Sequence, residues 1–288
     1  MKQIVKAIFT TALCLCLISS CHLIDFEEGC FYTGDVKVIF DWQHLNTRAE
    51  KPDIMQTVFY PDNSVLASYP LSGDTLLTGL AAANHAVLTY NHPQGITFYE
   101  MDCPCSAYAT LVTYTHDSKV YTTNVPALYA AKKEIAIPAF ERTECVLVPR
   151  PCFQQVFIDF VIIRRNVDTA IENLTGELSG VATRYSFGDM QAMQSQASLP
   201  FKSKEVTADK YSTAMCVLGM CPEVSKNIDI HLSLAGDRDY YQNLDLTGVF
   251  ENFTAPAIYL TIEVYLSNVG ISLSIADWCT GEGGHIDI

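Results

Sequence analysis

The sequence has few charged residues, and those that it has are mostly acidic. Of its 288 residues 17% are charged, and 32 Asp and Glu against 18 Lys and Arg give a formal net charge of −14. A surface this acidic repels phosphate backbones, which argues against nucleic acid as a partner. The sequence also has no basic patch that would attract anionic lipids, so attachment to a membrane would need another source.

The common catalytic motifs are missing as well. There is no G-x-S-x-G elbow, H-E-x-x-H motif, P-loop or G-x-G-x-x-G fingerprint. His85 and His92 could approach each other as metal ligands across a turn, but loop histidines are more often solvated. Asp237, Asp239 and Asp245 could bind calcium, yet their spacing does not match an EF-hand and favours a solvated turn. We therefore expect no enzyme, no cofactor and no metal site.

Helical spacing is nearly absent, and alternation with a period of two takes its place. Residues 76–83 are the one ambiguous segment. Alternating apolar and polar residues predict strands at 36–42, 54–60, 86–91, 96–100, 108–114, 119–122, 153–163, 228–234, 258–266 and 271–275. Strands with one apolar and one polar face are typical of antiparallel sheets packed face to face. The sequence therefore predicts an all-β fold.

A cluster of prolines, Pro138, Pro149 and Pro151, divides this pattern into two halves. We place one β-sandwich at residues 36–147 and a second at residues 148–288. Residues 185–212 are rich in Gln, Ser and Lys and predict a long loop or excursion in the second half.

The first 20 residues are typical of a secretory signal. Lys2 and Lys6 precede an apolar run that ends at Ile18, followed by two serines and Cys21. This arrangement predicts a lipobox, with Cys21 as the first mature residue and the site of lipidation. The alternative is an ordinary signal with a chance cysteine. Residues 21–35 are short and acidic and predict a tether.

Eight cysteines remain outside the signal and the lipidation site. In an oxidising envelope they permit up to four disulfides, and buried thiols are the alternative. Their spacing does not match the usual structural zinc sites. The eight are Cys30, Cys103, Cys105, Cys145, Cys152, Cys216, Cys221 and Cys279.

Several stretches together resemble the fimbrillin-type lipoproteins, and most closely the FimB-type fimbrium anchor and accessory proteins. They are the lipobox and tether, CFYTGDVKVIFDW at 30–42, VFYP at 58–61, LTGELSGV at 174–181 and the closing IADW at 275–278. The likeness covers nearly the whole chain and rests on strand patterns rather than catalytic signatures. It implies two tandem transthyretin-like antiparallel β-sandwich domains, held at the outer membrane by palmitate-type acyl chains. The cysteine content departs from that family.

The resemblance also implies a partner and a mode of assembly. Fimbrillin-type pilin subunits assemble by strand addition, in which one subunit supplies a strand to a sandwich of the next. Such pilins are activated by cleavage after a basic residue in the first domain, and Arg48 is the residue here that fits. A solvated loop arginine is the alternative. An anchor would keep its first strand and its lipid.

A second function class stays open from the residues alone. A surface glycan- or ligand-binding lipoprotein would stack sugar rings on exposed aromatics, for which Tyr240, Tyr241, Tyr259 and Tyr265 are candidates. That function needs a coplanar platform of exposed rings, whereas a fimbrial anchor needs an open apolar edge or groove. Most of the tyrosines can also be explained as cross-strand packing.

Overall fold

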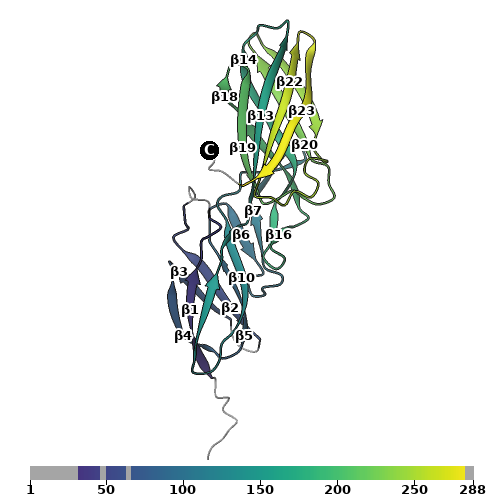
Figure 1. The fold of residues 1–288 in the computed structure, drawn as a ribbon. Helices are drawn as coiled ribbons and strands as arrows, with labels where there is room; N and C mark the ends of the chain where they lie inside the picture. Colours follow the sequence, from purple (N-terminus) through teal and green to yellow (C-terminus); the bar gives the residue numbers. More distant parts are fainter. Residues whose placement is uncertain (1–31, 46–49, 63–65, 283–288) are drawn as a thin grey trace, which may run out of the picture.

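The structure is a computed structural model that describes residues 32–45, 50–62 and 66–282. Every regular element in these three stretches is a β-strand, which confirms the predicted all-β fold. The same residues contain no helix long and apolar enough to cross a membrane. Figure 1 shows an elongated molecule in which two β-sandwiches follow one another end to end.

The first sandwich packs a three-stranded sheet, in the order β11-β1-β4, against a five-stranded sheet, in the order β12-β10-β5-β2-β3. Its core joins buried side chains of both sheets, among them Val36, Phe59 and Ile135. The strands are β1 (Thr33–Phe40), β2 (Met55–Pro61), β3 (Ala67–Leu71), β4 (Thr75–Ala81), β5 (Asn84–Tyr90), β10 (Tyr129–Ala136), β11 (Arg142–Leu147) and β12 (Arg150–Pro151).

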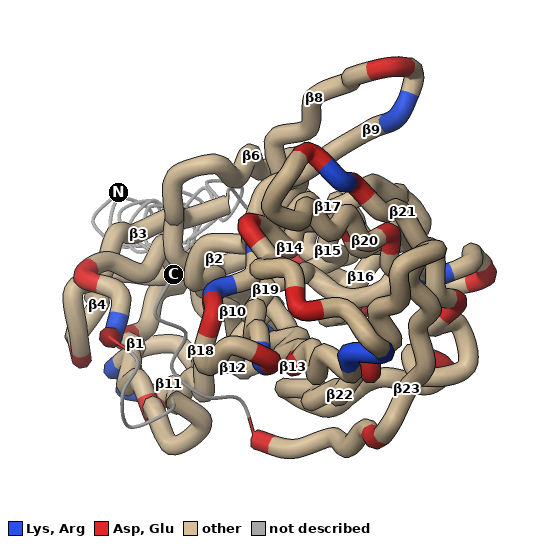
Figure 2. Tube along the Cα trace, turned by 90° about the horizontal axis from the view of Figure 1, so that it is seen from above, with Lys and Arg blue, Asp and Glu red and all other residues tan. Residues whose placement is uncertain are grey.

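The second sandwich packs a five-stranded sheet, β18-β19-β13-β22-β23, against a six-stranded sheet, β21-β20-β14-β17-β9-β8. The short hairpin of β8 and β9 projects from the body of the molecule (Figure 2). The strands are β8 (Thr113–His116), β9 (Lys119–Thr122), β13 (Gln154–Arg165), β14 (Ile171–Ala182), β17 (Gln196–Lys202), β18 (Lys204–Thr207), β19 (Lys210–Val217), β20 (Asn227–Leu234), β21 (Arg238–Asp245), β22 (Ala257–Ser267) and β23 (Gly270–Gly281).

A small third sheet lies at the junction of the sandwiches, in the order β16-β15-β7-β6. A separate apolar cluster forms there and combines residues of both halves of the chain, such as Leu111 and Phe187. Its strands are β6 (Ile96–Tyr99), β7 (Tyr108–Leu111), β15 (Arg184–Ser186) and β16 (Gln191–Ala192). The strands β7 and β9 precede residue 148, but they pair with β15 and β17, which follow it. The division of the chain between residues 147 and 148 stays a prediction.

Most neighbouring strands are antiparallel, but each sandwich contains a long parallel pair. β1 runs parallel to β11, and β13 runs parallel to β22. Period-two alternation assigns residues to faces and says nothing about strand direction, so the sequence could not reveal these pairs.

The expected loop, the expected end of the tether and the expected end of the last strand were wrong, and the structure resolves the one ambiguous segment. Residues 185–212 lie mostly in β15 to β19 and do not form a loop, because strand pairing is made by backbone groups that a polar composition does not display. The ambiguous 76–83 segment is the edge strand β4. β1 begins at Thr33, inside the expected tether, and β23 runs six residues beyond Ile275 to Gly281.

Candidate functional site

The first strand, β1, occupies the centre of its sheet. On one side it runs parallel to β11, in register from Asp35 opposite Arg142 to Phe40 opposite Leu147. On the other side it pairs antiparallel with β4. Both hydrogen-bonding edges of β1 are therefore used, and its removal would leave two unpaired edges facing each other. We call the space that β1 occupies between β4 and β11 the β1 slot.

The side chains of β1 complete the core of the first sandwich. Val36 and Val38 are fully buried and pack in one cluster with Phe59 and Leu147 of neighbouring strands. Without β1 these apolar groups would line the floor of the slot. An unpaired sheet edge above an apolar floor binds an extended strand with apolar residues at alternate positions.

Glycine is required where β1 enters the slot. A Cβ at Gly34 would lie 2.4 Å from the carbonyl oxygen of Pro138 and 2.8 Å from Cγ2 of Ile137. The backbone of the 137–141 segment therefore closes tightly around the start of the strand. The amide of Phe140 donates to the carbonyl oxygen of Thr33 at 2.8 Å, which fixes this contact.

The two residues singled out for processing lie outside the described residues. By sequence, Cys21 precedes β1, and Arg48 falls in the connection between β1 and β2. Lipidation at Cys21 and cleavage after Arg48 therefore stay predictions. Their positions in the chain bracket β1.

Several outer edges of the sheets are protected against adding another strand. β3 contains Pro70, which lacks an amide hydrogen, and β18 begins with Lys204 and Glu205. Arg238 and Asp239 open β21, another edge strand. Prolines and charges on an edge discourage pairing with a further chain.

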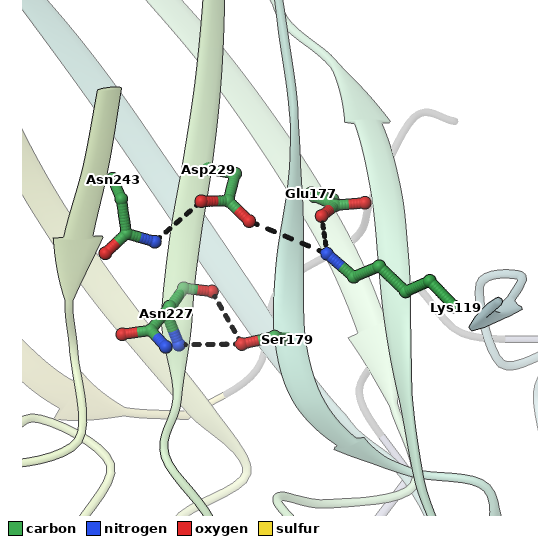
Figure 3. Close-up of polar contacts among 6 residues, drawn as sticks. All are labelled: Lys119, Glu177, Ser179, Asn227, Asp229 and Asn243. Carbon is green, nitrogen blue, oxygen red and sulfur yellow. Dashed lines mark hydrogen bonds and ion pairs between the residues drawn. The ribbon is translucent and has the colours of Figure 1, made fainter. Parts of the chain in front are cut away.

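The outer face of the six-stranded sheet carries a polar network (Figure 3). Glu177 on β14 lies directly opposite Asp229 on β20. Lys119 on β9 pairs with both carboxylates, through Glu177 Oε1 and, at 3.6 Å, through Asp229 Oδ2. Asn243 on β21 donates to Asp229 Oδ1 at 2.6 Å. Sequence analysis missed this network, because its members lie up to 124 residues apart and no local motif links Lys119 to Asn243.

The network holds the projecting hairpin against the sheet. β9 joins the sheet through a single register pair, Tyr121 opposite Ser198 of β17. Lys119 therefore spans β17 to reach β14 and β20. A second polar link below it joins Ser179 Oγ to the backbone amide and carbonyl of Asn227, at 2.9 and 3.2 Å.

The candidate aromatic residues do not form a platform for a sugar ring. Tyr240 packs against the core, whereas Tyr241 is 71% exposed and stacks on His231 with the ring centroids 4.3 Å apart. Tyr259 and Tyr265 share a face of β22, but six residues of extended strand separate them by roughly 20 Å. Each pair thus lacks the adjacent coplanar rings that the glycan hypothesis requires.

Each of the candidate metal ligands that the structure describes has another partner. The Nε2 atom of His85 lies 2.8 Å from the carbonyl oxygen of Ala81, and His92 packs against Phe98. Burial lowers the pKa of His92. The described residues include no group of three or more His, Cys, Asp and Glu side chains that could hold a metal ion.

The three candidate calcium ligands are not all at one place: Asp237 and Asp239 lie at the β20–β21 turn, and Asp245 ends β21 at the far end of that strand. Asp239 Oδ1 accepts from Ser233 at 2.7 Å and lies 3.0 Å from His231 Nε2, contacts that hold the pKa of Asp239 below its usual value. Asp245 accepts the amide of Thr247 at 2.8 Å, and Asp237 lies in the turn itself with φ of 56°. These contacts support the solvated-turn interpretation.

The seven described cysteines are all free thiols, so no pair among them confirms the disulfide expectation. Four of them are buried, which supports the alternative of buried thiols. Burial raises the pKa of Cys145 and Cys216 to about 11 and that of Cys152 to about 12. Cys30 lies outside the described residues.

A cavity of about 950 Å³ lies at the junction of the two sandwiches. Among the described residues that line it, Glu282 supplies the one carboxylate, and Cys152 supplies a thiol. A thiol with a pKa near 12 is protonated at neutral pH and is a poor nucleophile. The described lining therefore holds no pair of carboxylates, and its thiol is not an activated nucleophile.

Comparisons with known proteins support the fold. No family model matches the sequence, and no curated protein matches it. Among solved structures, a proposed adhesin from Bacteroides ovatus is 14% identical, with a TM-score of 0.60 over 82% of this chain and 90% of the other. The fimbrial anchor protein Mfa2 from Porphyromonas gingivalis is 13% identical, with a TM-score of 0.55 over 85% of this chain and 97% of the other.

A third solved structure is described as a proposed polysaccharide-binding protein. It comes from Bacteroides thetaiotaomicron and is 8% identical, with a TM-score of 0.52 over 84% of this chain and 96% of the other. At such identities the similarities show a shared fold and no more. The predicted two-sandwich architecture, which the resemblance to fimbrium anchor proteins implied, is therefore confirmed as a fold.

Proposed function

We propose that this chain is a lipid-anchored cell-surface protein that serves as an anchor or accessory component of fimbrillin-type fimbriae. One observation carries the proposal. The two-sandwich fold is shared with a fimbrial anchor protein, and its first strand pairs on both sides within a slot that, on this proposal, would accept a strand from another chain once β1 leaves it. The function is structural and adhesive, and no catalytic role is proposed.

The attachment to the outer membrane would come from acyl chains on Cys21. Thr33 lies twelve positions after Cys21, a separation that reaches at most roughly 40 Å when the chain is fully extended. The first sandwich would thus stand close to the membrane. Since the sequence has a formal net charge of −14, anionic lipids would not hold it there without the lipid.

The state of β1 would distinguish an anchor from a subunit that accepts a strand. An anchor keeps β1 in its slot, where both edges and the apolar face are satisfied. Cleavage after Arg48 would cut the covalent link between β1 and β2, so that a partner strand could replace β1. The chain would then bind a fimbrillin-type subunit by main-chain hydrogen bonds and alternate apolar side chains.

The test is a crosslinking pull-down of the full-length protein from its native cells, with Cys21→Ala as the variant. Fimbrillin-like subunits should copurify with the wild-type protein from the membrane fraction. In the variant the protein should leave that fraction, and fimbriae should be shed or lengthened. Cys279→Ala, which removes an exposed thiol on β23, is the matched control and should behave as the wild type.

Two outcomes would contradict the proposal. Recovery of the wild-type protein without any fimbrial subunit would remove the assembly role. Recovery of polysaccharide in place of subunits would favour the glycan-binding alternative, for which the four candidate tyrosines offer no platform.

A further inference from the structure

Two neighbouring cysteines lie in the turn between β6 and β7 of the junction sheet. In the sequence Cys103-Pro104-Cys105, the first cysteine is half-buried and the second is exposed. The turn is tightly hydrogen bonded. The amide of Cys103 donates to Glu100 at 3.2 Å, and the amides of Ser106 and Ala107 donate to the carbonyl oxygen of Cys103 at 3.2 and 3.0 Å.

Hydrogen-bond donors converge on the sulfur of Cys103. The thiol and backbone amide of Cys105 and the hydroxyl and backbone amide of Ser106 all donate to it. Donors of this kind stabilise a thiolate more than a thiol. They lower the pKa of Cys103 from its ordinary value of 9.0 to about 7, whereas donation to Cys103 raises the pKa of Cys105.

The surroundings of the pair contain one ammonium group, one carboxylate and one neutral hydroxyl. Lys132 on β10 donates to the carbonyl oxygen of Gly188 at 3.1 Å, and its charge acts on Cys105. Asp102 and the Tyr60 hydroxyl lie near Cys103, and Tyr60 donates to the carbonyl oxygen of Met101 at 2.9 Å. Burial raises the pKa of Tyr60, so this hydroxyl is neutral at physiological pH.

The backbone around the pair is closely packed. A Cβ added at Gly188 would lie 2.3 Å from the carbonyl oxygen of Cys105, so β15 and its following turn press directly against the cysteine turn. The two thiols are thus held next to each other on a supported backbone. Residues two apart span at most roughly 7 Å, which lies within or close to the Cα separation of a disulfide.

We propose that Cys103 and Cys105 form a redox-active dithiol that exchanges with small-molecule disulfides. The Cys103 thiolate attacks one sulfur of the disulfide, forms a mixed disulfide and releases one thiolate. Cys105 then loses its proton to solvent and attacks the Cys103 sulfur, which releases the second thiol. The two protein thiols are oxidised to one disulfide, and the small disulfide is reduced to two thiols.

The other described cysteines are unsuited to this role. Cys145, Cys152 and Cys216 are buried with raised pKa values, and Cys221 is buried as well. Cys279 is exposed on β23, apart from this turn. A soft metal ion would find two thiol ligands here, but no third ligand among the described residues completes a site.

The experiment uses the full-length protein, reduced and then incubated with oxidised glutathione in the presence of a chelator. Free thiols are alkylated and the protein is digested with trypsin. Cleavage after Arg48 and Lys119 isolates a peptide of residues 49–119, in which Cys103 and Cys105 are the two cysteines. We expect the oxidised peptide to carry no alkyl group and to be about 2 Da lighter than the reduced peptide without alkylation. Treatment with excess reduced glutathione before alkylation should give the peptide with two alkylated thiols.

Two variants distinguish thiol–disulfide exchange between the two cysteines from the simple reaction of a solvent-exposed thiol. In Cys105→Ser the mixed disulfide with glutathione should accumulate on Cys103, because no second thiol resolves it. In Cys103→Ser the remaining Cys105 should react at least tenfold more slowly. Both side chains lie in a surface turn, and near-ultraviolet circular dichroism of each variant checks that the fold persists.

Either of two results would overturn the proposal. One is a wild-type peptide that keeps two alkylated thiols after oxidation. The other is a mixed disulfide that persists on the wild-type protein to the same extent as on Cys105→Ser. Both outcomes leave the proposed fimbrial role untouched, since that role does not use these thiols.

Discussion

Glu177 on β14 lies directly opposite Asp229 on β20, and Lys119 lies between the two carboxylates (Figure 3). Like charges directly opposite each other in an antiparallel pair are destabilising, so the ammonium group offsets a repulsion built into the sheet. Through these two ion pairs Lys119 also links the β8–β9 hairpin to the body of the sandwich.

Lys119→Met should lower the free energy of unfolding by about 1 kcal/mol at low ionic strength. The loss should shrink in high salt, which screens the remaining carboxylates. Adding Asp229→Asn to the variant should restore most of the stability, because the repulsion disappears. Urea unfolding measures all three proteins, and Lys37→Met, which breaks an exposed pair with Glu144, is the matched control and should change little.

A loss in Lys37→Met as large as that in Lys119→Met would contradict this explanation. So would a double variant that is less stable than Lys119→Met alone. Hydrogen exchange should additionally show faster exchange in residues 113–122 of the Lys119→Met protein, since the hairpin loses its tie to β14.

Val38→Ala should destabilise the first sandwich by about 1.5 to 3 kcal/mol. Val38 is fully buried opposite the fully buried Cys145, so the truncation leaves a cavity in the slot. Lys37→Ala changes the adjacent residue of the same strand on the solvent face and should cost less than about 0.5 kcal/mol. Chemical denaturation of both variants compares them directly, and equal effects would show that the core packing of β1 is unimportant.

Alkylation of Cys103 should rise with pH through a midpoint of about 7 rather than 9. The thiolate is the reactive form, and the donors around Cys103 lower its pKa, so the thiolate appears at lower pH. Iodoacetamide rates over pH 5 to 10, assigned to Cys103 by fragmentation of the 49–119 peptide in the mass spectrometer, give the midpoint.

Ser106→Ala removes one side-chain donor to Cys103 and should move that midpoint upward. Charged or titratable neighbours remain in place in this variant: Cys105, Asp102, Tyr60 and Lys132. An unchanged midpoint in Ser106→Ala, or a wild-type midpoint near 9, would disprove the assignment of the donors.

Gly176→Ala should destabilise the second sandwich by about 1 to 3 kcal/mol. A Cβ at this position would lie 2.2 Å from the carbonyl oxygen of Asp229 and 2.7 Å from the ring of Phe201. Gly248 has no atom within 4 Å of its Cβ position and lies in the same sandwich, so Gly248→Ala should be nearly neutral. Thermal unfolding of the two variants tests the contrast, and comparable losses would contradict it.

Alternating residues located about half of the 23 strands that the structure describes but not the neighbours of any strand. Ile228, Ile230, Leu232 and Leu234 face the core, and the strand that contains them differs by one residue from its predicted bounds. The same pattern could not show that β1 lies between β4 and β11, because alternation defines faces and pairing depends on the whole chain. The candidate slot was therefore found only in the structure.

Polar edge strands escaped prediction for a related reason. All four residues of β18, Lys204 to Thr207, are exposed, so the segment has no apolar face to detect. Its pairing with β19 is made by backbone groups, which the sequence does not display. The polar network of Lys119 escaped similarly, since its partner Glu177 is 58 residues away.

The parallel pairs have a consequence for how the chain folds. Asp35 pairs with Arg142, and Gln155 pairs with Ala257. The two residues of each pair are roughly a hundred residues apart in the sequence. Neither sandwich can close until nearly all of its own sequence has been synthesised, and contacts between such distant residues form slowly because the loop-closure entropy must be overcome first. Slow closure would keep the chain extended for longer, which suits a protein that the predicted signal sends across a membrane unfolded.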